Sequence, residues 1–180
     1  MFKILEDEHL DQAIEQELDG VPWLSPYLPT TQGSIDAFFR FAGVSATDTI
    51  VDIGCGDGRV LVTAAKVIGC RGIGIDISQA CIDLAFAVGE AEGVSGLISW
   101  HCADATLPRA FDDLGLASAS VVYLYAYPTL LTKLQGLLVK IAERARVFTL
   151  QYHMDHLEGW EPFLSCTEPS MRLYRPFRRA

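Results

Sequence analysis

Residues 49–59 have the sequence TIVDIGCGDGR, in which a β-branched run ends in a glycine-rich turn. The run over 49–54 predicts a buried strand, and the apolar residues after the turn recur at helical spacing, at Leu61, Ala64, Ala65 and Ile68. Glycines between a strand and a helix let the backbone turn sharply and approach a ligand closely. We therefore expect a strand, a glycine loop and a helix here, with a ligand crevice at the loop.

The rest of the chain repeats this alternation. β-branched runs predict four further strands, at 71–76, 97–102, 119–125 and 146–152. Helical patterns follow Ser78 and begin at Pro128, and the first of them places an apolar face at Ile82, Ala85, Phe86 and Gly89. An antiparallel pair is expected at 163–167 and 171–177, with its arginines exposed. The fold class is α/β: one doubly wound, mostly parallel sheet with helices on both faces and a C-terminal antiparallel strand pair.

The chain has 180 residues, of which 50% are hydrophobic and 21% charged, so one domain with a sizeable core is expected. An acidic helical extension is predicted over residues 1–24, and the main domain over 25–180. The net charge of -9 argues against a general nucleic-acid binder, because a phosphate backbone requires a basic surface. It favours a basic protein or a small molecule as the partner.

Targeting and membrane segments are not visible. The acidic start of the chain is unlike a transit or signal peptide, and the longest apolar run, 121–127, is far shorter than the ~20 residues that span a bilayer. The five cysteines form no CxxC pair, so neither a disulfide framework nor a zinc site is predicted, and no other metal is expected. These features predict an intracellular, cytoplasmic protein.

Carboxylates stand where the first three predicted strands end, at Asp52, Asp76 and Asp104. Asp52 opens the motif D-x-G-x-G-x-G, whereas the dinucleotide motif GxGxxG would require glycine in place of Arg59. An acid at 52 would repel a pyrophosphate but can accept hydrogen bonds from a cationic ligand. Asp76 can accept both hydroxyls of a ribose. The structural alternatives are an acid at a helix N-terminus for Asp76, and a turn residue or the cap of a following short helix for Asp104.

In its strand-loop-helix context, the motif resembles the cofactor loop of the class I, Rossmann-like S-adenosyl-L-methionine-dependent methyltransferases. Together with Pro26–Thr30, Val51–Lys66 and Gly159–Pro162, it resembles the small protein-lysine N-methyltransferases related to those that modify the ATP synthase c-subunit and the adenine nucleotide translocase. The resemblance covers residues 25–165. The mitochondrial members carry an apolar membrane segment where this chain is acidic. The fourth strand ends in YLYAYP (123–128) and not in the Asn-Pro-Pro-Tyr of amide and adenine methylases.

The resemblance implies S-adenosyl-L-methionine as the cofactor. Asp52 would orient its methionine end, Asp76 its ribose, and Asp104 its adenine amino group. The implied cofactor-binding residues are Pro29, Thr30, Asp52, Gly54, Cys55, Gly56, Gly58, Asp76, Ile77, Asp104, Ala105 and Tyr123. The proline-rich segment that contains Pro29 would cover the methionine end as a rigid lid; the alternative is a plain connector.

The implied reaction is methylation of a lysine in a protein, preferably a basic one, and neither nucleic acid nor a membrane is expected as a partner. The lysine must first lose its proton, and an aromatic channel lowers its pKa by desolvation. Tyr125 and Tyr27 are the candidates for this channel. Tyr123, Tyr125 and Tyr127 would share a face if the strand continued that far, although each could instead be a core residue. His153 is weighed as a general base against a place in a surface loop.

Three other functions stay open at this point. A small-molecule methyltransferase of the same fold is disfavoured because the chain has little length to spare for a substrate cap. A nicotinamide-dependent oxidoreductase is disfavoured by Asp52 and Arg59. The third is a non-catalytic adenosine-binding module, which only an activity assay would distinguish from an enzyme.

Overall fold

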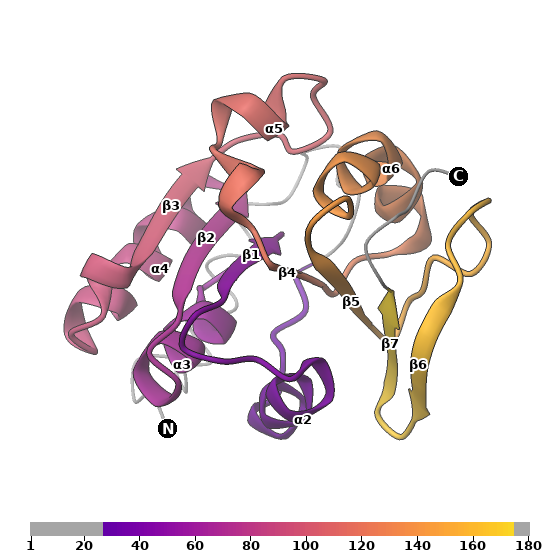
Figure 1. The fold of residues 1–180 in the computed structure, drawn as a ribbon. Coiled ribbons are helices and arrows are strands. Elements are labelled where there is room, and N and C mark those ends of the chain that lie inside the picture. Colours follow the sequence, from indigo (N-terminus) through magenta and orange to yellow (C-terminus); the bar gives the residue numbers. More distant parts are fainter. Residues whose placement is uncertain (1–26, 175–180) are drawn as a thin grey trace.

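A seven-stranded sheet forms the centre of the protein (Figure 1). The computed structural model describes residues 27–174, so the predicted extension over 1–24 lies outside the described residues. The strands are β1 (Thr49–Ile53), β2 (Arg71–Asp76), β3 (Ile98–Cys102), β4 (Val121–Leu124), β5 (Arg146–Leu150), β6 (Pro162–Thr167) and β7 (Ser170–Tyr174). Their order is β3-β2-β1-β4-β5-β7-β6; the first five pair in parallel, and β7 runs antiparallel to β5 and β6. The predicted fold class is confirmed.

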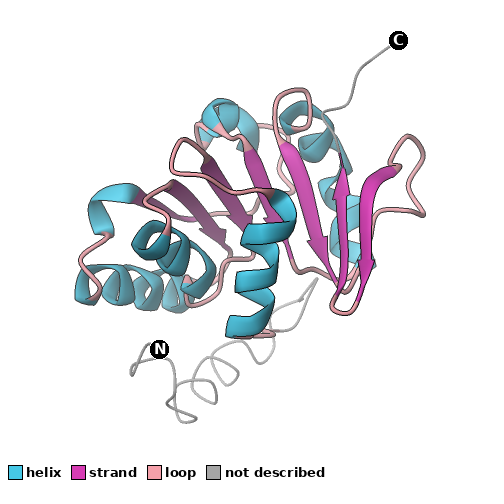
Figure 2. Ribbon diagram, turned by 60° about the horizontal axis from the view of Figure 1, so that its bottom comes forward, coloured by secondary structure: helices cyan, strands magenta, loops and turns pink. Residues whose placement is uncertain are grey.

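Helices cover both faces of the sheet (Figure 2). One face carries α2 (Gln32–Ala42), α3 (Arg59–Val67) and α4 (Gln79–Ala91), and the other carries α5 (Ala110–Asp113) and α6 (Pro128–Ile141). Two short 3-10 helices, η2 (Ser95–Leu97) and η3 (Leu116–Ser118), precede β3 and β4. Within residues 27–174, no helix has the length and apolar character needed to cross a membrane.

Strand periodicity explains the two cores. Ile50 of β1 packs into the core beneath α2 and α3, whereas Val51 and Ile53 point into the core beneath α6. The helices begin at the residues expected of them: the Ser78 side chain caps α4 by accepting from the Cys81 N–H at 3.2 Å, and Pro128 is the first residue of α6.

The strand order reverses at β1, which lies between β2 and β4. In open α/β sheets, ligands bind at such a switch point, outside the carboxyl ends of the strands. Asp52 of β1 lies opposite Tyr123 of β4 in the pairing register. The topology therefore places the carboxylate of the glycine motif at the crevice.

The condition under which Tyr123, Tyr125 and Tyr127 would share one face, a strand that continues to Tyr127, is not met. Strand β4 ends at Leu124, because the residues that follow lead into α6, where Tyr127 is the N-cap residue and Pro128 takes the first position. Only Tyr123 therefore belongs to the strand.

Two side chains differ in burial from the sequence expectation. Phe86 of α4 is 53% exposed, because the buried stripe of this helix runs through Ile82, Ala85, Val88 and Gly89. Arg172 of β7 is only 21% exposed in its side chain and pairs with Asp155, with Nε 3.4 Å from Oδ2. The other C-terminal arginines lie outside the described residues.

Candidate functional site

A cavity of about 550 Å³ opens at the carboxyl ends of the parallel strands. Small-molecule sites typically enclose about 300–1,000 Å³. Its walls are the glycine loop after β1, the turns after β2 and β3, the end of β4, the start of α6 and segment 27–30. Thirteen of the predicted site residues line it: Tyr27, Pro29, Thr30, Asp52, Gly54, Cys55, Gly56, Asp76, Ile77, Asp104, Ala105, Tyr123 and Tyr125.

The glycine loop takes a left-handed backbone at Gly54 (φ 82°), Gly56 (φ 52°) and Gly58 (φ 76°). L residues with a side chain rarely adopt this conformation. The N–H groups of Gly54 and Cys55 donate to the Ile75 carbonyl at 2.8 and 3.0 Å, which ties the loop to β2. A Cβ on Gly56 would lie 2.9 Å from the Tyr27 ring, so the missing side chain lets segment 27–30 approach the loop.

Gly58 is the predicted cofactor residue that does not line the cavity. A Cβ there would lie 2.5 Å from the Trp100 ring of β3 and 2.8 Å from Cβ of Ala85 on α4. Gly58 therefore gives the turn a left-handed backbone and makes room for the Trp100 indole.

Carboxylates dominate the polar wall of the cavity. Asp52 is only 2% exposed, and its burial, followed by the charges of Asp76 and Asp57, raises its pKa well above the ordinary range. Burial also raises the pKa of Asp76, against the effect of its hydrogen bonds. Asp76 accepts the Gly56 N–H at 2.8 Å and the Ser78 N–H at 3.0 Å. Buried acids with elevated pKa values favour a cationic ligand beside them.

Asp57 had no role assigned from the sequence, although it stands in the quoted motif. It is 3% exposed and accepts the Tyr27 hydroxyl at 2.9 Å. Arg59, the next residue but one, donates its Nε to the same oxygen at 2.8 Å and forms an ion pair with it. Asp57 thus anchors segment 27–30 through Tyr27, while Arg59 compensates its charge.

Segment 27–30 is an ordered wall of the cavity. Tyr27 holds one end through Asp57, and Thr30 holds the other, with its Oγ1 2.9 Å from the hydroxyl of Tyr123. Both Thr30 and Tyr123 are buried. Thr31, which follows directly, caps α2 by accepting the Ser34 N–H. Side-chain hydrogen bonds therefore fix segment 27–30 at both ends, and the segment leads directly into α2.

We expect Thr30→Val to lower the free energy of unfolding by about 1–3 kcal/mol, because the buried Tyr123 hydroxyl loses its partner. Tyr123→Phe should behave similarly, and the double variant should lose less than the sum of the two. Chemical denaturation of the four proteins without added ligand measures the coupling, which should be about 1 kcal/mol. Strict additivity would contradict the contact.

Asp104 lines the cavity and also closes a turn. Its Oδ1 accepts the N–H of Thr106 at 2.8 Å and the hydroxyl of the same residue at 2.6 Å. The turn alternative is therefore present in the structure, whereas Asp104 does not cap α5, whose N-cap residue is Arg109. Ile77, 51% exposed, and the buried Ala105 supply apolar surface beside this acid.

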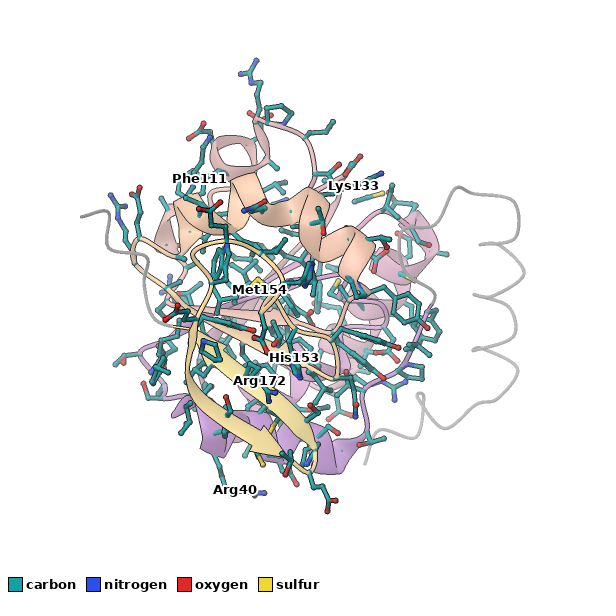
Figure 3. All side chains as sticks on the ribbon, turned by 90° about the vertical axis from the view of Figure 1, so that its right-hand side faces the viewer. Arg40, Phe111, Lys133, His153, Met154 and Arg172 are labelled. Atoms are coloured by element: carbon teal, nitrogen blue, oxygen red, sulfur yellow. The ribbon has the colours of Figure 1, made fainter. Side chains whose placement is uncertain are left out.

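Helix α6 contributes two cavity residues that the sequence did not reveal, Leu130 and Lys133. Figure 3 shows Lys133 on this helix. The two positions are three apart, so they share one face near the N-terminus of the helix. The sequence shows how far Leu130 and Lys133 lie from the start of α6. It does not show how α6 is rotated on the sheet, which decides that these two side chains line the cavity.

His153 has a structural role. Its Nδ1 lies 2.8 Å from Oγ1 of Thr149 and its Nε2 2.8 Å from Oγ of Ser170, so the ring bridges β5 and β7. It is not among the residues that line the cavity. Figure 3 shows His153, which follows β5, near Arg172 of β7. Residues 27–174 hold no group of three or more His, Cys, Asp or Glu side chains suited to a metal ion.

Burial, and then the charge of Arg172, lower the pKa of His153 from its ordinary 6.5, while Asp155 acts in the opposite direction. The unfolded chain therefore binds the proton more readily, and the stabilisation from neutral His153 is complete above pH 6.5 and lost as the pH falls through the folded-state pKa. We expect the free energy of unfolding of His153→Gln to fall less between pH 7 and pH 5 than that of the unaltered protein. Urea unfolding of both proteins over this pH range measures the difference, and an equal dependence of the two free energies on pH would contradict the prediction.

The known proteins to which this chain is similar are methyltransferases. A family model described as a methyltransferase domain matches residues 50–145. A protein-lysine N-methyltransferase of Saccharolobus islandicus (strain REY15A) is 31% identical over a match that covers 76% of this chain and 81% of that protein. The crystal structure of an RNA methyltransferase from Salinibacter ruber with S-adenosyl-L-homocysteine has a TM-score of 0.72 at 26% identity, covering 85% of this chain and 95% of that one.

A more distant likeness concerns the fold alone. The structure of an S-adenosylmethionine-dependent methyltransferase from Thiobacillus denitrificans, also with S-adenosyl-L-homocysteine, has a TM-score of 0.54 at 22% identity and covers 71% of this chain and 51% of that one. Both of these solved structures hold the demethylated form of one cofactor.

Proposed function

Because this chain belongs to the methyltransferase domain family and uses S-adenosyl-L-methionine, we propose that it methylates the side-chain amine of a lysine in a protein substrate. The observation that carries the proposal is the 31% identity to a protein-lysine N-methyltransferase over three quarters of the chain. The nicotinamide alternative is set aside, since the similar solved structures hold S-adenosyl-L-homocysteine.

The cavity fits this cofactor, which carries an ammonium and a sulfonium charge beside an adenosine. Buried Asp52, flanked by two further acids, suits the ammonium group. In our proposal Asp76 accepts the ribose hydroxyls and Asp104 the adenine amino group. The remaining contacts come from Pro29, Thr30, Gly54, Cys55, Gly56, Ile77, Ala105 and Tyr123, whereas Gly58 acts indirectly through the turn.

When held by these residues, the cofactor would supply an electrophilic methyl carbon, to which a neutral amine would bond through its lone pair while the carbon–sulfur bond broke and its electron pair stayed on sulfur. A lysine ammonium must lose its proton before this attack. Tyr27 and Tyr125, which line the cavity, would surround the amine and lower its pKa by desolvation. The anchored lid would exclude water and hold the amine in line with the methyl group.

A basic protein suits the charge of the chain. With a net charge of -9, the molecule attracts a positively charged partner more readily than a nucleic acid. The five cysteines are all free, as expected of a protein in a reducing compartment. We therefore place the reaction in the cytoplasm, on a basic protein.

RNA is the second candidate for the methyl acceptor. It is favoured by one observation, the similarity to the RNA methyltransferase of Salinibacter ruber at 26% identity. The acidic wall of the cavity opposes the approach of a phosphate backbone, which is why we prefer the lysine.

Incubation of the purified protein with a cell extract and methyl-labelled cofactor tests the acceptor. We expect label in protein, mapped by mass spectrometry to lysine, and no label with Asp76→Ala. Label that is removed by ribonuclease would establish the second candidate instead. Label confined to small molecules would refute both.

A further inference from the structure

Gln151 is the one non-glycine residue of the described chain, 27–174, with a positive φ, 63°. The Tyr152 N–H donates to the Leu150 carbonyl at 2.7 Å, which closes a three-residue turn at the carboxyl end of β5. A turn of this kind with a positive central φ is rare and strained. The Gln151 N–H donates to the Ser170 carbonyl of β7 at 2.8 Å, so the sheet holds the turn in place.

The turn brings the Tyr152 ring into contact with two tyrosines that follow β4. Tyr152 stacks with Tyr125 at a centroid distance of 6.3 Å and an interplanar angle of 21°. It meets Tyr127 edge-on, at 4.6 Å and 74°. All three rings are only half-buried. Tyr125 also lines the cavity, so the cluster of three rings adjoins the cavity wall.

The chemistry of this cluster favours an organic cation. Tyrosine faces attract a cation through their quadrupole, and methylated ammonium groups are known ligands of such rings. The neighbouring cavity holds the acids Asp52, Asp57 and Asp76, which add to the attraction. Strain that the surrounding structure maintains at a site edge commonly accompanies function.

We propose that Tyr125, Tyr127 and Tyr152 form an acceptor subsite that binds the methylated ammonium group of a substrate lysine through cation–π contacts. This inference rests on the proposed lysine reaction and adds to it. A mono- or dimethylated lysine is retained as the cation at the cavity mouth, and it loses its proton on passing from the rings into the cavity, where the same nitrogen can be methylated again. Tyr152, which the sequence did not single out, is the residue that completes the subsite.

Binding of two matched probes tests the subsite. We would titrate the protein, saturated with S-adenosyl-L-homocysteine, with acetyl-trimethyl-lysine amide and with its neutral tert-butyl isostere, by calorimetry. The cation should bind more tightly than the isostere. Tyr152→Leu should weaken cation binding about two- to fivefold and leave the isostere unchanged, whereas Tyr152→Phe keeps the ring and should retain the preference. Equal binding of both probes to the unaltered protein would overturn the proposal.

Thermal unfolding shows whether Tyr152→Leu has kept its fold. If it has not, Tyr127→Leu serves as the second test of the preference for the cation over the isostere. A cytidine monophosphate titration addresses the competing use of these rings: nucleotide binding that Tyr152→Leu abolishes, without any cation preference, would assign the cluster to RNA bases and overturn the subsite. The titrations need no turnover. A protein that methylates lysine in the extract but shows no cation preference would therefore refute the subsite alone.

Discussion

Asp76→Ala is expected to weaken binding of S-adenosyl-L-methionine about 10²- to 10⁴-fold, because it removes the two charge-assisted hydrogen bonds that we propose between Asp76 and the ribose, worth roughly 1.5–3 kcal/mol each. The substitution also removes the acceptor for the Gly56 and Ser78 N–H groups, which loosens the glycine loop. Asp76→Asn, which keeps one oxygen, should lose less affinity than alanine. Calorimetric titration of the purified variants measures both.

The matched control is Asp83→Ala, on the exposed side of α4 and outside the cavity. Asp83→Ala makes the same change in net charge as Asp76→Ala. Because Asp83 lies outside the cavity, the affinity of this variant for the cofactor should equal that of the unaltered protein. An Asp76→Ala protein with native affinity and a native melting temperature would show that the ribose is held elsewhere.

Gly58→Ala should have the largest effect on stability. The left-handed backbone at 58 costs an L residue about 1–2 kcal/mol, and overpacking against Trp100 and Ala85 adds about 1–3 kcal/mol. We expect the free energy of unfolding to fall by about 2–5 kcal/mol. In a chain of this size, each kcal/mol lost lowers the melting temperature by about 2–4 °C. Thermal and urea unfolding both measure it.

Gly69→Ala separates the two causes. Gly69 has a similar φ, 80°, but a Cβ there would meet no atom within 4 Å. This variant should therefore show the backbone penalty alone, about 1–2 kcal/mol. Trp100→Leu in the Gly58→Ala background should recover part of the packing loss. Equal destabilisation by Gly58→Ala and Gly69→Ala would mean that the indole yields without penalty.

Much of the candidate site followed from local sequence. Asp52 and Asp76 could be placed because each lies near the carboxyl end of a predicted strand in a chain that alternates strands and helices, and parallel strands end at one edge of the sheet. The glycines at 54 and 56 could be placed because few other residues adopt their backbone conformation. These inferences need only neighbours within a few positions.

Other parts of the site were out of reach of such reasoning. Asp57 stands in the same motif, yet its role depends on Tyr27, 30 residues earlier in the chain. Phe86 was misplaced because helical spacing alone does not set the rotation of α4 on the sheet. Tyr152 was overlooked because its contacts depend on a left-handed turn at Gln151, a conformation that glutamine does not itself prefer.

The amino-acid sequence by itself determined the alternation of strands and helices, the glycine loop and the acids at the strand ends, because periodicity and backbone preference act locally. Only the tertiary structure decided which side chains meet across the cavity. The Thr30–Tyr123 contact joins residues 93 positions apart, and the Trp100 ring packs against Gly58 through the pairing of β3 and β2 and the packing of α4. Such contacts arise from sheet register and helix packing, and no local propensity specifies them.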